Sequence, residues 1–80
     1  MIRDEIIQII KEEEPDFGPI GEKTNLYTDI GLDSLSFISL LMEIEEAYSI
    51  TFDIAEMEPC LEFGHLTALV ESKVKEREGQ

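Results

Sequence analysis

The chain has 80 residues, of which 42% are hydrophobic, and its 19 acidic and 6 basic side chains give a formal net charge of −13. This length and apolar content predict a single small folded domain over residues 1–80. The charge argues against nucleic acid as a partner, because phosphates are bound by Lys and Arg, and against anionic membrane surfaces. With one Cys and one His, the chain cannot form a disulfide within itself and is unsuited to a structural zinc site.

Neither a membrane span nor a signal peptide is expected. Acidic residues interrupt the isoleucines of the first 14 residues, and the longest uncharged run, residues 34–42, is too short to cross a bilayer. We therefore expect a cytoplasmic protein, and we expect it to be a monomer.

The first 14 residues carry isoleucines within one arc of a helical wheel, which predicts an amphipathic helix from residue 2 to about residue 14. Pro15 ends it, because the residue before a proline avoids the helical region. Residues 15–33 hold three of the five glycines and predict a long loop. We expect the apolar side chains of this loop to hold it on the core: Phe17, Ile20, Leu26, Tyr27, Ile30 and Leu32.

Residues 34–48 predict a second helix with Asp33 as its N-cap. A wide apolar arc of this helix should face the core: Phe37, Leu40, Leu41, Ile44, Ala47 and Tyr48. A separate apolar stripe, here called the outer stripe, consists of Leu35, Ile38 and Met42. Either the outer stripe is buried as well, or it contacts a partner, since a chain of this size has few elements to cover both sectors.

The alternation of Ile50, Phe52 and Ile54 with polar residues hints at a short extended segment, and residues 55–61 at a brief helical turn bent by Pro59. Apolar spacing predicts a last helix over residues 64–77, with Lys73 and other bases at its C-terminal end. The predicted fold class is therefore all-α: a small four-helix bundle of three main helices and one short helix, with a long loop between the first two.

Charge is distributed unevenly along the chain. Between Asn25 and Ser72 there is no Lys or Arg, while 10 acidic residues occur there. Such a segment attracts basic partners in a salt-dependent manner. The alternative is an acidic surface that serves only solubility.

Catalytic and metal-binding motifs are absent from the sequence. The segment that starts at Asp29 fails the calcium-loop pattern, and the residues around Ser34 lack the glycines of a hydrolase elbow. Ser34 instead starts a predicted helix at the end of a long loop, which is a favourable place for a phosphate ester. The alternative is that Ser34 only helps to cap the helix.

The sequence LYTDIGLDSL at residues 26–35, followed by LLMEIEEAYSI at residues 40–50, resembles the acyl carrier proteins. The resemblance covers the whole chain and implies their four-helix layout. It implies that Ser34 receives 4′-phosphopantetheine from coenzyme A through a separate magnesium-dependent transferase, which would read Asp33 and Leu35. It also implies a carrier that holds acyl groups as thioesters on this arm and is not itself an enzyme.

For such a carrier, partners would be the phosphopantetheinyl transferase and acyl-transfer, synthase or ligase enzymes with basic docking patches. We expect Glu45 and Glu46 to steer these partners by charge. The outer stripe, Leu35, Ile38 and Met42, would then supply the apolar contact at short range.

The resemblance is closer to carriers of polyketide or other specialised pathways than to those of housekeeping fatty acid synthesis. The latter usually have acidic residues where this chain has Ser36 and Ser39. Two alternatives remain. The first is an unmodified acidic helical adaptor; the second is a peptidyl or aminoacyl carrier, which is disfavoured because those usually resemble G-G-x-S at the serine.

Overall fold

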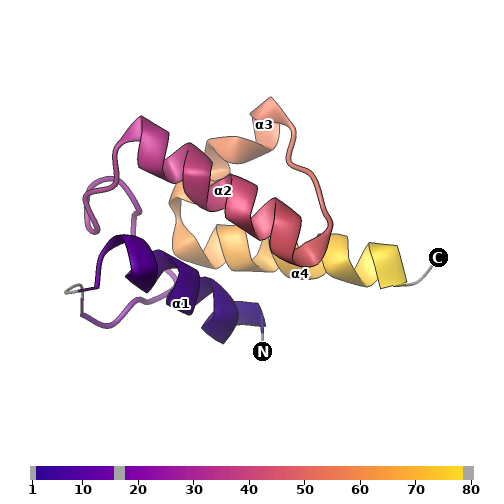
Figure 1. Ribbon diagram of the computed structural model, residues 1–80, viewed down its shortest axis with the longest axis horizontal. Coiled ribbons are helices and arrows are strands. Elements are labelled where there is room, and N and C mark those ends of the chain that lie inside the picture. The colour runs from indigo at the N-terminus through magenta and orange to yellow at the C-terminus, as the bar shows by residue number, and fades with distance from the viewer. Residues whose placement is uncertain (1, 16–17, 79–80) are drawn as a thin grey trace.

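A computed structural model describes residues 2–15 and 18–78 of the chain. Its elements are α1 (Ile2–Glu13), α2 (Ser34–Tyr48), α3 (Ile54–Met57), the 3-10 helix η1 (Pro59–Leu61) and α4 (Phe63–Glu78) (Figure 1). Within the described residues, the one extended pairing is an isolated bridge between Asn25 and Glu62. The predicted all-α fold with one short helix and a long first loop is confirmed, and its radius of gyration is 11.9 Å.

The core lies between the three long helices and the loop. In Figure 1, α1 lies below α2, and α4 passes behind both; α1 contacts each of the other two. The spacing of the isoleucines brings Ile6 and Ile10 of α1 to full burial. Other fully buried side chains come from the loop, α2, η1 and α4: Leu26, Leu40, Leu41, Ile44, Cys60, Phe63, Leu66 and Val70. No helix in the described part of the chain is both long and apolar enough to span a membrane.

The C-terminal end of α2 corrects one detail of the predicted apolar arc. Ala47 is exposed, because it lies at the edge of the arc in the last turn, whereas Tyr48 lies nearer the centre and is half-buried. The Tyr48 hydroxyl donates a hydrogen bond to the Glu5 carboxylate on α1. Burial and this contact with Glu5 raise the pKa of Tyr48, so the phenol keeps its proton. The chain leaves α2 at Ser49, which has a positive φ of 55°.

The predicted extended segment after α2 is wrong. Ile50 and Phe52 are buried, but no strand forms there, and Ile54 begins α3 with 87% of its surface exposed. The alternation therefore reflects a loop that inserts two side chains into the core. The helix starts at this position because the Asp53 N–H donates to the Glu56 carboxylate at 2.8 Å, which satisfies an N-terminal donor.

None of the side chains of α3 is fully buried. Met57 packs half-buried against the core, and polar contacts of Glu56 add to it. Lys73 of α4 lies 3.0 Å from the Glu56 carboxylate and over the ring of Phe52, 5.9 Å from its centroid. The hydrogen bond from Asp53, and next to it the contact with Lys73, lower the pKa of Glu56. This carboxylate is therefore ionised at neutral pH, when the contacts form.

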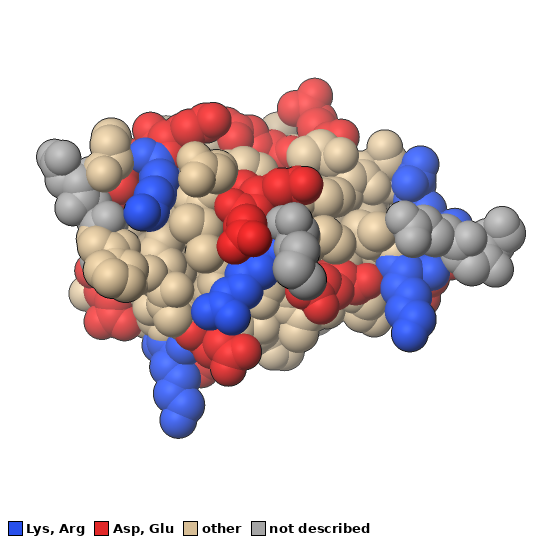
Figure 2. Space-filling view, turned by 90° about the horizontal axis from the view of Figure 1, so that it is seen from below, with Lys and Arg blue, Asp and Glu red and all other residues tan. Residues whose placement is uncertain are grey.

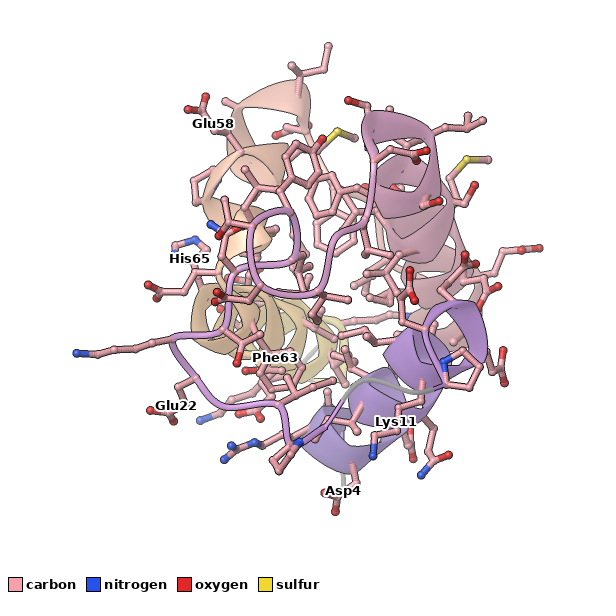
Figure 3. All side chains as sticks on the ribbon, turned by 90° about the vertical axis from the view of Figure 1, so that its left-hand side faces the viewer. Asp4, Lys11, Glu22, Glu58, Phe63 and His65 are labelled. Atoms are coloured by element: carbon pink, nitrogen blue, oxygen red, sulfur yellow. The ribbon has the colours of Figure 1, made fainter. Side chains whose placement is uncertain are left out.

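Backbone hydrogen bonds tie the long loop to η1 and to the start of α4. The Leu26 N–H donates to the Leu61 carbonyl at 2.8 Å, and the Gly64 N–H donates to the Glu22 carbonyl at 2.7 Å. Figure 3 looks at this end of the bundle, where the loop passes Glu22 and Phe63. Of the predicted loop contacts, the structure buries Ile20, Leu26, Ile30 and Leu32 and half-buries Tyr27, whereas Phe17 lies outside the described residues.

Replacing Gly64 with alanine should loosen this loop. An added Cβ would lie 2.7 Å from the backbone oxygen of Glu22, closer than the two atoms tolerate. We expect the free energy of unfolding to fall by about 1–3 kcal/mol, as for other overpacked sites, measured by urea denaturation. Gly18→Ala is the matched control, because nothing lies within 4 Å of its added Cβ. Equal stabilities of the two variants would contradict the prediction.

Candidate functional site

Ser34 is the first residue of α2, and its side chain is exposed. The N-cap is Asp33, whose carboxylate accepts a hydrogen bond from the Ser36 N–H at 2.8 Å. This confirms the prediction that Asp33 caps the helix. The hydroxyl of Ser34 is not needed for that task.

The hydrogen bonds from Ser36 lower the pKa of Asp33. A carboxylate at a helix N-terminus also interacts favourably with the helix dipole. Because the pKa is lower in the folded state, the stabilising effect is complete above the ordinary value of 3.8 and disappears as the pH falls through the lowered value. The cap is thus intact at neutral pH.

The loop before Ser34 alternates buried and exposed positions. Gly31 adopts a φ of +89°, a conformation that glycine tolerates and other residues rarely adopt. Leu32 follows with 6% exposure, and its N–H donates to the Leu26 carbonyl at 3.0 Å. With Leu32 buried on one side and Phe37 on the other, the chain presents Asp33 and Ser34 to solvent.

Tyr27 is a site residue that sequence reasoning did not find. It was expected only to hold the loop on the core, and it is indeed half-buried. Its hydroxyl donates to Ser34 Oγ at 3.3 Å, and its ring meets Phe37 edge to face with a centroid distance of 5.5 Å. No local pattern could have predicted this contact, because six residues of irregular loop separate Tyr27 from Ser34.

The outer stripe of α2 is exposed. Leu35, Ile38 and Met42 keep 75%, 46% and 58% of their surfaces accessible. The alternative in which the bundle buries this stripe is therefore wrong. Three large apolar side chains in one row, starting next to Ser34, are typical of a surface that contacts another protein.

The two glutamates predicted for docking have different environments. Glu46 is exposed, whereas Glu45 is half-buried and accepts a hydrogen bond from the Phe52 N–H at 2.8 Å. Glu45 thus fixes the segment between α2 and α3, a role that the sequence did not predict. A change at Glu45 would disturb the fold as well as the surface charge.

Charge differs between the two sides of the bundle. Helix α2 contains no Lys or Arg. The view from below, away from α2, shows lysine and arginine side chains at both ends and between them, mixed with acidic ones (Figure 2). The acidic residues of α2 therefore have no basic partner within their own helix.

The remaining chemically reactive side chains lie elsewhere. Cys60 is buried, and burial raises the pKa of its thiol to about 11, so it is not a thiolate at neutral pH. His65 is exposed on α4 and points away from the bundle (Figure 3). Among the described residues, no group of three or more potential metal ligands comes together.

The chain is similar in sequence to proteins of known family. A family model described as "Phosphopantetheine attachment site" matches residues 2–71. An acyl carrier protein of Thermotoga maritima is 29% identical over 59 residues, which cover 74% of this chain and 73% of the relative. No solved structure gives a significant match. Because the family model spans most of its length, this chain belongs to the phosphopantetheine-binding family of acyl carrier proteins, which are carriers and not enzymes and hold a covalently attached 4′-phosphopantetheine.

Proposed function

We propose that Ser34 is the residue to which 4′-phosphopantetheine is attached. The observation that carries the proposal is an exposed hydroxyl on the first residue of α2, beside a cap that Asp33 already provides. Buried side chains on both sides, Leu32 and Phe37, fix the position of this hydroxyl. The start of a helix also favours a phosphate ester, through its N–H groups and its dipole.

In the attachment reaction, the Ser34 oxygen forms a bond to the pantetheine-bearing phosphorus of coenzyme A. The bond from that phosphorus to the leaving 3′,5′-ADP breaks, and the serine proton passes to a base of the transferase. The chain itself supplies the oxygen and the surface that the transferase reads. We place Asp33 and Leu35 in that surface, because both are exposed and flank Ser34.

The attached group supplies a terminal thiol on which acyl groups travel as thioesters. This protein presents them to separate enzymes, and tethering raises their effective concentration at each partner's active site. The outer stripe supplies the apolar docking contact and Glu46 steers basic patches on acyl-transfer, synthase or ligase partners. Such a small surface binds weakly, which lets the carrier leave after each transfer.

We further propose a monomeric, cytoplasmic carrier of a dedicated, polyketide-like pathway. Ser36 and Ser39 support the choice of pathway, because carriers of fatty acid synthesis usually have acids there. The intact mass of the protein purified from its native host would test this choice. A polyketide-type acyl group would support it, whereas a fatty acyl, peptidyl or aminoacyl group would contradict it.

The attachment itself is tested by intact-mass spectrometry. The apo protein is incubated with coenzyme A, magnesium and a broad-specificity phosphopantetheinyl transferase. We expect the mass to rise by one phosphopantetheine group. A folded protein that stays unmodified would support the acidic adaptor instead.

Reversing one charge on α2 should slow this modification. We expect Glu46→Lys to lower the rate about three- to tenfold at low salt, because the exposed Glu46 steers a basic partner, and to flatten the salt dependence. The measurement is the initial rate of mass gain at several salt concentrations. Glu13→Lys makes the same charge change at an exposed position of α1 and should behave as wild type. Equal slowing by both variants would contradict docking on α2.

A further inference from the structure

We infer that Tyr27 is a positioning residue of the attachment site, whose hydroxyl donates a hydrogen bond to the Ser34 oxygen before attachment and to the phosphodiester afterwards. The inference depends on the proposed role of Ser34. Its starting point is the 3.3 Å separation between Tyr27 Oη and Ser34 Oγ, with tyrosine as the donor.

The backbone of Tyr27 is fixed from both sides. The Asn25 side-chain oxygen accepts hydrogen bonds from the N–H groups of Tyr27 at 2.8 Å and Thr28 at 2.9 Å, which forms a tight turn. The preceding residue, Leu26, is fully buried and bonded through its N–H to the Leu61 carbonyl. The tyrosine therefore projects from an ordered part of the loop.

The ring of Tyr27 is fixed on the same helix that begins with Ser34. It meets the ring of Phe37 edge to face, at 5.5 Å and an interplanar angle of 84°. Phe37 lies one turn after Ser34 and is buried, so this contact sets the distance between the phenol and the first turn of α2. Packing on Phe37 therefore directs the Tyr27 hydroxyl toward Ser34, independently of the hydrogen bond between the two hydroxyls.

The local charge explains why a neutral donor matters at this position. A phosphodiester on Ser34 would add an anion beside the ionised Asp33, in a segment without Lys or Arg from residue 25 to residue 72. The Asp33 carboxylate already takes the Ser36 N–H. Tyr27 supplies a hydrogen-bond donor without a positive charge that would disturb the acidic docking surface.

The test compares wild type with Tyr27→Phe, which removes the hydroxyl and keeps the ring on Phe37. In the modified proteins we expect the phosphorus NMR resonance of the phosphodiester to shift between the two. In the modification assay we expect kcat to fall about two- to tenfold, the effect of one hydrogen bond, with KM for the apo protein unchanged. An unshifted resonance together with a wild-type kcat would overturn the inference.

Tyr48→Phe is the matched control, because it removes a phenol hydroxyl at the opposite end of α2. It should leave the phosphorus resonance and kcat unchanged; equal effects of both variants would overturn the inference.

If Tyr27→Phe does not fold, the modified wild-type protein still tests the inference. The measurement is the nuclear Overhauser effect between the Tyr27 ring and the pantetheine methylene next to the phosphate. Its presence supports the inference, and its absence overturns it. Failure of the proposed function would be distinguishable from failure of this inference. In that case the wild-type protein itself would gain no mass in the modification assay, and both proposals would be wrong.

Discussion

Ser34→Ala is expected to abolish the phosphopantetheine mass gain completely. Alanine has no oxygen that could bond to phosphorus. We expect the other hydroxyls of the first turns of α2, those of Ser36 and Ser39, not to replace it. The fold should be unaffected, because Asp33 and not Ser34 caps the helix. The measurement is intact mass after prolonged incubation, together with the helical circular dichroism of the variant.

Ser39→Ala is the matched control for this experiment. It deletes an exposed hydroxyl from the same helix and should gain mass as wild type does. A Ser34→Ala protein that still gains the full mass would place the attachment elsewhere. Loss of modification in both variants would indicate that the helix surface and not the Ser34 oxygen is responsible.

The sequence predicted the parts of this molecule that depend on local pattern. Helical spacing located α1, α2 and α4 to within one residue at each boundary, because burial of one apolar face repeats every few residues. It also placed Asp33 as the N-cap and separated the outer stripe from the core-facing arc. Both follow from residue type and position on a single helix.

The sequence could not predict contacts that depend on the path of the long loop. No sequence pattern marks Gly64, although a side chain at this position would meet the Glu22 carbonyl. Tyr27 reaches Ser34 only because the turn at Asn25 and the packing on Phe37 aim its ring. The sequence predicts Glu45 on the surface only. Its hydrogen bond with the Phe52 N–H could not be predicted, because an irregular segment lies between the two residues. Each is a tertiary contact without a periodic signal.

Leu41→Ala and Met42→Ala are expected to have opposite effects on stability and docking. Leu41 is 1% exposed, so truncation leaves a cavity and should lower the free energy of unfolding by about 2–5 kcal/mol. Met42 is 58% exposed, and its truncation should change stability by less than about 0.5 kcal/mol. In urea denaturation, Leu41→Ala should lower the midpoint of unfolding by roughly 1–3 M, given the dependence of the free energy of unfolding on urea concentration in small proteins.

The modification assay should reverse this order. Met42→Ala removes an apolar contact from the outer stripe and should lower kcat/KM for the transferase, while Leu41→Ala should keep the wild-type value once corrected for its folded fraction. Neighbouring residues on one helix would then separate stability from recognition, because successive side chains are about 100° apart around the helix axis, which places Leu41 in the core and Met42 on the surface. If Met42→Ala lowered stability as much as Leu41→Ala, the outer stripe would belong to the core. If neither variant changed kcat/KM, docking would lie on another face, and the exposed row beside Ser34 would need a different explanation.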